Sequence, residues 1–257
     1  MPIQLLLNFT ANRAWADTLN LLLIEATDYI DTHQVRITGR RLAHIRDVHQ
    51  IEVGQSLRAG EINGLIGTAQ LQSIGEHEAI FNLTLTEQAP KVLPATIILA
   101  MPRPKMFKRT LQTMAAMGVK EIYLINAYRV DKSYWSTPLL SESAIYEQLT
   151  LGLEQAGDTL LPKVHIRKRF KPFIEDELPQ IIRGKRALIA HPYNAKECPE
   201  PSLEESVIAI GPEGGFIPYE VDLMQQQGME PIHIGQRILR VETAVPVLLS
   251  RLFPIQN

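Results

Sequence analysis

The chain has 257 residues, of which 45% are hydrophobic and 21% are charged, and this balance is typical of a globular protein with a sizeable core. Cys198 is the only cysteine, which excludes an internal disulfide and a cysteine-rich zinc site. The net charge of −2 excludes a surface that is basic throughout, so any contact with nucleic acid has to be local.

The start of the chain, MPIQLLLNF, has neither the basic segment nor the apolar length of a signal peptide. No window of the sequence approaches the roughly 20 apolar residues that a membrane-spanning helix needs. The sequence therefore predicts a cytoplasmic protein without a membrane segment.

Residues 1–88 carry short alternating runs that are separated by turn residues. Asn63-Gly64 is a strong tight-turn pair. Thr38 is the expected N-cap of one helix, with Leu42, Ile45 and Val48 facing inward. Strands at this spacing favour a small β-barrel. The predicted strands are Ser56–Ala59, Leu65–Leu71 and Ala79–Leu85.

From residue 89 to residue 257 the pattern alternates between strands and helices, which favours an α/β domain with a mainly parallel, helix-covered sheet. The predicted strands are Ala95–Ala100, Glu121–Ile125, Lys163–Ile166, Ala187–Ala190, Val207–Ile210 and Pro231–Ile234. Three apolar stripes predict helices: Phe107, Leu111 and Met114 before Gly118; Ile145, Leu149, Leu153 and Ala156 before Gly157; and Val241, Ala244, Leu248 and Leu252 near the C-terminus.

A glycine-rich loop, Gly211-Pro212-Glu213-Gly214-Gly215, follows the strand Val207–Ile210 directly. Such glycines allow the backbone to approach a ligand closely. The loop lacks the Lys-Ser or Lys-Thr of a Walker loop and the spacing of the dinucleotide fingerprint. It therefore suits a flat, uncharged group better than a polyphosphate. A tight turn into a helix that begins at Pro218 is an equally simple interpretation.

A second segment, Ile234–Ala244, carries two arginines between a predicted strand and the C-terminal helix. Glu242 and Thr243 fall in the first turn of that helix, where they would satisfy free N–H groups and complement the helix dipole. Arg240, taken alone, is as consistent with a solvated loop cation as with a functional group.

Together, the segments Ile-Gly-Pro-Glu-Gly-Gly and Ile-Leu-Arg-Val-Glu-Thr-Ala, about two dozen residues apart near the C-terminus, resemble the RsmE branch of the SPOUT methyltransferases nearly residue for residue. Weaker similarity extends over the chain, at Arg40–Arg58, Glu154-Gln155, Pro162 and His191-Pro192. The resemblance implies S-adenosylmethionine-dependent methylation of uridine N3 in 16S ribosomal RNA of the small ribosomal subunit.

The resemblance also implies a PUA-like RNA-binding β-barrel in residues 1–88 and a SPOUT methyltransferase domain with a deep trefoil knot in residues 89–257. It implies a homodimer, in which the stripe of the last helix is either dimer surface or ordinary core, and it implies no metal. Carried over by motif, the expected cofactor-binding residues are His191, Pro192, Gly211, Pro212, Glu213, Gly214, Gly215, Ile234, Gly235, Ile238, Leu239, Thr243 and Ala244.

Methyl transfer to uracil N3 requires that this weakly acidic nitrogen loses its proton. A site therefore benefits from a donor at the flanking carbonyl oxygens, and it can also offer a base. Arg240 is the first candidate for the donor, and its competing role is to bind the carboxylate of the methionine moiety. Glu242 or Glu213 are candidate proton acceptors, although a structural capping role fits each of them better.

N3 lies on the Watson–Crick edge, so the target uridine has to be unpaired or splayed out. Three basic clusters are candidates for binding phosphate, although each is also consistent with a solvated face. The first contains Arg36, Arg40, Arg41 and Arg46, the second Arg103, Lys105, Lys108 and Arg109, and the third Arg167, Lys168, Arg169 and Lys171.

Two segments depart from the family pattern, Ala115–Gly118 and Gly157–Leu160, and both are expected on the substrate side of the site. The cofactor is therefore a firmer expectation than the identity of the uridine. Two alternatives remain open: another SPOUT methylation, such as ribose 2′-O or a different base, and a non-catalytic RNA-binding factor of ribosome assembly. A nucleotide-dependent enzyme is disfavoured because the phosphate-loop lysine is missing.

Overall fold

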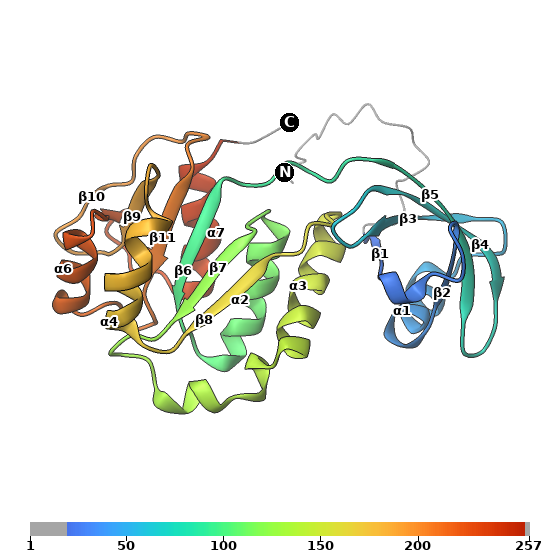
Figure 1. Cartoon of the computed structure of the whole chain (residues 1–257), viewed down its shortest axis with the longest axis horizontal. Coiled ribbons are helices and arrows are strands. Elements are labelled where there is room, and N and C mark those ends of the chain that lie inside the picture. The colour runs from blue at the N-terminus through green and yellow to red at the C-terminus, as the bar shows by residue number, and fades with distance from the viewer. Residues whose placement is uncertain (1–19, 255–257) are drawn as a thin grey trace, which may run out of the picture.

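The structure is a computed structural model that describes residues 20–254, apart from the side chains of residues 48 and 49. It contains two β-sheets, a five-stranded one near the N-terminus and a seven-stranded one that is covered by helices (Figure 1). The predicted α/β class is confirmed, and a separate small sheet lies in the N-terminal part of the chain.

The smaller sheet has the strand order β1-β3-β4-β5-β2. The pairs β3–β4, β4–β5 and β5–β2 are antiparallel, and β1 joins β3 in parallel. Its strands are β1 (Leu22–Ile24), β2 (Gln34–Ile37), β3 (Ser56–Glu61), β4 (Ile66–Ile74) and β5 (Ala79–Glu87). The three predicted strands correspond to β3, β4 and β5, whereas β1 and β2 were not predicted. At the predicted turn, Asn63 has a φ of 60°, and the N–H of Gly64 donates to the carbonyl of Glu61.

Two short helices lie between β2 and β3. Thr38 is the N-cap of α1 (Gly39–His44), which continues into the π-helix η3 (Ile45–His49). Leu42 and Ile45 are buried, as expected from their spacing, and they join a core that includes Phe81 and Leu57. The side chain of Val48 lies outside the described atoms. A short 3-10 helix, η2 (Ala26–Asp28), follows β1.

The larger sheet has the order β10-β12-β9-β11-β6-β7-β8, and every neighbouring pair in it is parallel. The interior strand β6 is buried at every residue, which explains why its sequence is a continuous apolar run. The strands are β6 (Ala95–Ala100), β7 (Glu121–Ile125), β8 (Lys163–Arg167), β9 (Arg186–Ala190), β10 (Lys196–Glu197), β11 (Ser206–Ile210) and β12 (Glu230–His233).

Helices cover both faces of this sheet (Figure 1). On one face α2 (Pro104–Ala116) packs between α3 (Glu142–Ala156) and α7 (Val241–Leu252). The other face carries α4 (Phe170–Pro172), η6 (Phe173–Glu177), α5 (Leu178–Ile181) and α6 (Pro218–Gln226). Two 3-10 helices, η4 (Lys132–Ser136) and η5 (Pro138–Leu140), lead from β7 into α3.

The apolar stripe of the last helix is core within the single chain. Val241, Leu248 and Leu252 are each at most 3% exposed, and α7 packs on α2. Gly118 and Gly157 follow α2 and α3 with φ values of 82° and 69°, as expected for helix stops. Ala156, which was expected on the α3 stripe, is exposed because it lies in the last turn of the helix.

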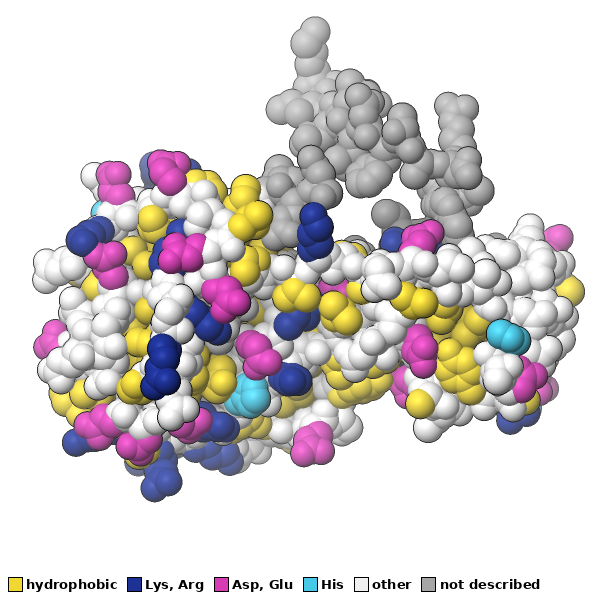
Figure 2. Space-filling model, turned by 45° about the horizontal axis from the view of Figure 1, so that its top comes forward, with side chains coloured by type: hydrophobic (Ala, Val, Ile, Leu, Met, Phe, Trp, Pro, Cys, Tyr) yellow, Lys and Arg dark blue, Asp and Glu magenta, His cyan; other side chains and the backbone are white. Residues whose placement is uncertain are grey.

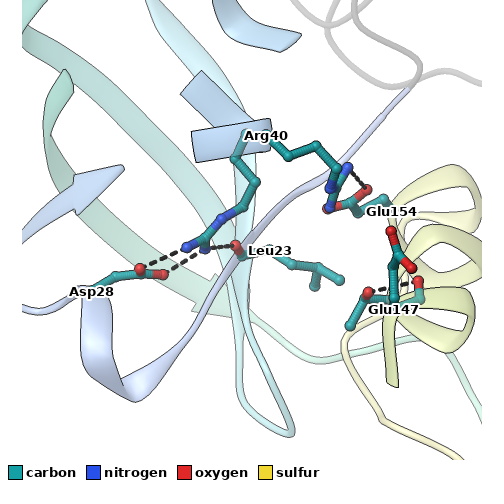
Figure 3. Close-up of polar contacts among 7 residues, drawn as sticks. Leu23, Asp28, Arg40, Glu147 and Glu154 are labelled. Atoms are coloured by element: carbon teal, nitrogen blue, oxygen red, sulfur yellow. Dashed lines mark hydrogen bonds and ion pairs between the residues drawn. The ribbon is translucent and has the colours of Figure 1, made fainter. Parts of the chain in front are cut away.

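The two parts of the chain meet at the C-terminal end of α3. The guanidinium of Arg40 binds both carboxylate oxygens of Glu154, at 2.8 and 3.1 Å (Figure 3). The hydroxyl of Thr159 donates to the carbonyl of Gly64 at 2.7 Å, and a Cβ on Gly60 would lie 2.4 Å from the γ-methyl of Thr159. The departure from the family pattern at Gly157–Leu160 therefore lies in this contact.

Within residues 20–254, no helix combines the length and the apolar content that crossing a bilayer requires.

Candidate active site

A pocket of about 630 Å³ lies at the carboxyl ends of β9 and β11, beside the start of α7. Ligands of parallel sheets bind at this edge, and the volume is in the range of small-molecule sites. Three loops that the sequence singled out form most of its wall. The predicted residues that line it are His191, Pro192, Gly211, Pro212, Glu213, Gly214, Gly215, Ile238, Leu239 and Ala244.

The glycine loop folds back on itself where it lines the pocket. The N–H of Gly215 donates to the carbonyl of Pro212 at 2.7 Å, and Gly215 has a φ of 72°, which favours glycine. A Cβ on Gly211 would lie 3.0 Å from the backbone nitrogen of Phe216. The same residues therefore form a tight turn and expose backbone to the pocket, so both interpretations of the loop apply.

Two glutamates attach this loop and α6 to neighbouring segments. Oε1 of Glu213 accepts a hydrogen bond from the backbone N–H of Arg103 at 3.0 Å, at the start of α2. The carboxylate of Glu220, which is 3% exposed, accepts from the N–H of Ile217 at 3.0 Å and from the N–H of Tyr128 at 2.7 Å. The capping role that the sequence suggested for Glu213 is therefore present in the structure.

His191 brings an imidazole to the wall of the pocket. Its buried Nδ1 has no hydrogen-bond partner among the described residues. Burial lowers the pKa of His191, and the neighbouring charge of Arg129 lowers it further, so the ring is neutral near neutral pH. Because a buried polar atom is costly without a partner, Nδ1 is suited to a hydrogen bond with a bound ligand.

Arg129 also lines the pocket, and the sequence interpretation did not include it. It lies in the loop after β7, and its guanidinium donates to the carbonyl of Gly214. Its position shortly after the carboxyl end of the predicted strand Glu121–Ile125 was the available signal. Phe216, Asp222 and Gln225 are further lining residues that were not singled out.

The remaining predicted cofactor residues lie next to the pocket. Ile234 and Gly235 line a smaller cavity of about 100 Å³, which shares His191, Ile238 and Ala244 with the main pocket. Thr243 is exposed on α7 and lines neither cavity. The strand before this loop ends at His233, one residue earlier than predicted.

The two predicted catalytic residues lie at the start of α7. Arg240 is the N-cap of this helix, with its carbonyl accepting from the N–H groups of Thr243 and Ala244. Its side chain is exposed and stands between Leu239 and Val241, both of which line the pocket. Glu242 is half-buried in the first turn, where a carboxylate complements the helix dipole. Neither side chain forms a hydrogen bond or ion pair with any of residues 20–254.

The first basic cluster is engaged in contacts within the protein. Arg41 donates to both carboxylate oxygens of Asp28, at 2.6 and 2.7 Å, and to the carbonyl of Leu23, and this ion pair raises the pKa of Arg41 against the opposing effect of burial. Arg46 donates to the carbonyl of Gly75, and Arg40 binds Glu154. These contacts make Arg41 a structural residue of the N-terminal domain rather than an available phosphate ligand.

The second cluster remains available. Arg103, Lys105, Lys108 and Arg109 are exposed at the start of α2, and none of their side chains forms an ion pair with another residue of the described part of the chain. In the third cluster Lys168 and Arg169 are exposed after β8, whereas Arg167 binds Glu177. Basic and acidic side chains alternate over the face of the larger domain in Figure 2, so the charge on that face is mixed.

No cluster of three or more His, Cys, Asp or Glu side chains suited to a metal ion occurs among residues 20–254.

Comparison with known proteins identifies the family to which the chain belongs. A family model described as an RNA methyltransferase domain matches residues 89–253. The chain is 26% identical over 233 residues to the ribosomal RNA small subunit methyltransferase E of Treponema pallidum, covering 88% of this chain and 87% of that protein. It is 24% identical over 248 residues to the protein of the same name from Synechocystis, covering 90% and 76%.

Two solved structures share the fold. A methyltransferase from Legionella pneumophila in complex with the cofactor SAM has a TM-score of 0.71 at 22% identity, covering 90% of this chain and 96% of that chain. The ribosomal RNA small subunit methyltransferase E from Neisseria gonorrhoeae, bound to S-adenosyl methionine, has a TM-score of 0.72 at 19% identity, covering 90% and 95%. At these identities the likeness establishes the fold.

Proposed function

The chain belongs to the RNA methyltransferase family, and from its pocket we propose that it transfers the methyl group of S-adenosylmethionine to N3 of a uridine in 16S ribosomal RNA of the small subunit. The curated relatives confirm the resemblance to the RsmE family. The observation that carries the proposal is the convergence of three sequence-distant loops, after β9, after β11 and before α7, on one pocket.

The pocket wall fits S-adenosylmethionine. The glycine loop offers backbone groups to a ligand, and Ile210, Leu239 and Ala244 offer apolar surface for a flat adenine. The unpartnered Nδ1 of His191 offers one further hydrogen bond. The neutral state of this ring also matters, because a protonated imidazole would repel the positive sulfonium.

The methyl donor supplies a reactive methyl group and a neutral leaving group. The protein then has to bind the uracil, orient N3 toward the methyl group and favour its deprotonated form. We assign Arg240 to bind the uracil carbonyl oxygens or the carboxylate of S-adenosylmethionine. Its guanidinium is free of polar contacts with residues 20–254, and its neighbours in the sequence, Leu239 and Val241, both line the pocket. Glu242 remains the proposed proton acceptor, because the carboxylate of Glu213 is engaged at α2.

RNA binding is assigned to the exposed cations at the same edge of the sheet. Arg103, Lys105 and Arg109 follow β6, and Lys168 and Arg169 follow β8, so both sets lie at the carboxyl edge where the pocket opens. Phosphate contacts of this kind position a substrate without reading its sequence. Arg40 binds Glu154 and Arg46 binds the carbonyl of Gly75, so either arginine can bind RNA only if the substrate displaces that contact.

Further features of the family are proposed with this activity. They are a trefoil knot in the C-terminal segment, a homodimer through the knotted domain, a PUA-like RNA-binding domain in residues 1–88 beside the catalytic domain in residues 89–257, and a cytoplasmic location. One observation supports the knot. Helix α7 packs on α2, and the last residue of α7, Leu252, accepts a hydrogen bond through its carbonyl from the N–H of Ser202, which lies in the segment between β9 and β11.

The test is incubation with labelled S-adenosylmethionine and small ribosomal subunits, followed by nucleoside analysis of the RNA. Label in 3-methyluridine is the expected result. Label in a 2′-O-methyl nucleoside or in another base would replace the proposed reaction by a different RNA methylation. Donor binding without transfer to any ribosomal RNA would favour a non-catalytic RNA-binding factor.

A further inference from the structure

Tyr128 is an exposed aromatic residue beside the pocket. It follows β7, and 79% of its surface is accessible, the largest fraction among the exposed large hydrophobic residues of the described chain. Its side chain forms no hydrogen bond or ring contact with any other residue from 20 to 254. A ring in this setting contributes little to the fold.

The backbone that carries this ring is held firmly. The N–H of Tyr128 donates to the buried carboxylate of Glu220, and the N–H of Val130 donates to the carbonyl of Ala127 at 3.0 Å. Ala127 and Val130 are 2% and 7% exposed, so the two exposed residues between them, Tyr128 and Arg129, protrude from a turn whose ends are packed in the core.

Arg129 connects this turn to the pocket. It lines the pocket, and its guanidinium reaches the carbonyl of Gly214. A Cβ on Gly214 would lie 2.9 Å from Cδ of Arg129, so the arginine lies directly against the glycine loop. The backbone of Tyr128 is therefore held next to a residue that lines the pocket, and its ring is open to solvent. A second exposed aromatic residue, Tyr219, precedes Glu220 in the first turn of α6 and is 53% exposed.

We propose that Tyr128 is a stacking platform for a base of single-stranded RNA next to the methylated uridine, on a turn that Arg129 holds against the glycine loop. The inference rests on the proposed function and specifies how its substrate is held. A uridine that offers N3 is unpaired, so its neighbours present open faces, and proteins bind such faces by stacking them on aromatic rings. Stacking of this kind needs no hydrogen-bond partner for the ring, because the faces of the bases are apolar.

The test measures binding of a fluorescein-labelled, single-stranded oligoribonucleotide, with one uridine flanked by adenines, to the full-length protein by fluorescence anisotropy. Tyr128→Phe keeps the ring, Tyr128→Leu keeps apolar bulk without the ring, and Tyr128→Ala removes both. Since stacking contributes about 1–3 kcal/mol per base, the Leu and Ala variants are expected to raise the Kd roughly tenfold, while the Phe variant stays within about twofold.

Two controls complete the design. Calorimetric titration with S-adenosylmethionine is expected to give the same affinity for all three variants, which separates the rim from the donor pocket. Methyl transfer to small subunits is measured in parallel. Equal oligonucleotide affinities in the Phe, Leu and Ala variants would overturn the stacking role, and so would an equal loss in Phe and Ala. Ring-dependent RNA binding in a wild-type protein that transfers no methyl group would overturn the proposed function instead.

Discussion

Glu213 and Arg103 join the glycine loop to the first turn of α2 through a single 3.0 Å hydrogen bond, from the backbone N–H of Arg103 to Oε1 of Glu213. The contact places an acidic loop residue at the positive end of a helix, where a carboxylate is favoured. It also links the glycine loop of the pocket to the helix that carries the exposed cations Arg103 and Lys105.

We predict that Glu213→Gln keeps most of the methyl-transfer activity, because the amide oxygen of glutamine can accept the same hydrogen bond. Glu213→Ala is expected to weaken donor binding several-fold by releasing the loop. For both variants, methyl transfer from labelled S-adenosylmethionine to small subunits is measured together with the affinity for S-adenosylmethionine. Loss of transfer in the Gln variant, with unchanged donor affinity, would instead identify Glu213 as the proton acceptor.

Arg240→Ala is expected to abolish methyl transfer while leaving the melting temperature unchanged. The fold depends on the backbone carbonyl of Arg240, which caps α7, and not on its exposed side chain. Measuring kcat separately from the donor affinity decides between the two roles: a loss of kcat alone indicates contact with the uracil, and a loss of affinity indicates contact with the donor carboxylate. Wild-type activity would remove Arg240 from the mechanism.

For Gly214→Val we predict loss of S-adenosylmethionine binding in calorimetry. The added side chain meets Arg129 and fills space at the wall of the pocket. Gly75→Val is the matched control, since a Cβ there meets only the carbonyl oxygen of Glu78 at 3.6 Å. Unchanged donor affinity in Gly214→Val would contradict the close approach of this loop to the ligand.

Replacing Arg41 by alanine is expected to lower the free energy of unfolding by about 3 kcal/mol, since removal of one partner leaves a buried charge on Asp28, which is 8% exposed. Arg36→Ala breaks an exposed pair with Glu78 and should cost less than about 1 kcal/mol. Urea unfolding followed by circular dichroism compares them. A large loss of RNA affinity in a stable Arg41→Ala variant would restore its expected role as an RNA ligand.

Long apolar strands of the larger sheet could be predicted from the sequence, whereas very short strands could not. Ala95–Ala100 and Glu121–Ile125 were predicted with their observed bounds, because both are apolar runs beside recognisable helix stripes. β1 has only three residues and β10 only two, and both owe their place to pairing with strands more than 30 positions away in the sequence. A local pattern cannot report such pairing.

The site showed the same division. The glycine loop and the segment before α7 carry their own sequence signature, whereas Arg129 lines the pocket next to Gly214, which is 85 residues away in the sequence. Likewise, nothing next to Arg41 in the sequence distinguishes it from Arg40, although one is bound to Asp28 within its own domain and the other to Glu154 across the domains. Long-range contacts decided both assignments.

The attachment of the N-terminal domain at Glu154 and Thr159 has a consequence for the size of the substrate. These residues precede β8 and lie at the amino edge of the sheet, whereas the pocket lies at the carboxyl edge near β9, four strands across. Strand spacing of about 4.8 Å and a rise of about 3.3 Å per residue put these places roughly 25 Å apart. A ligand that touches both has to extend over that diagonal, which a folded nucleic acid can do and a free nucleoside cannot.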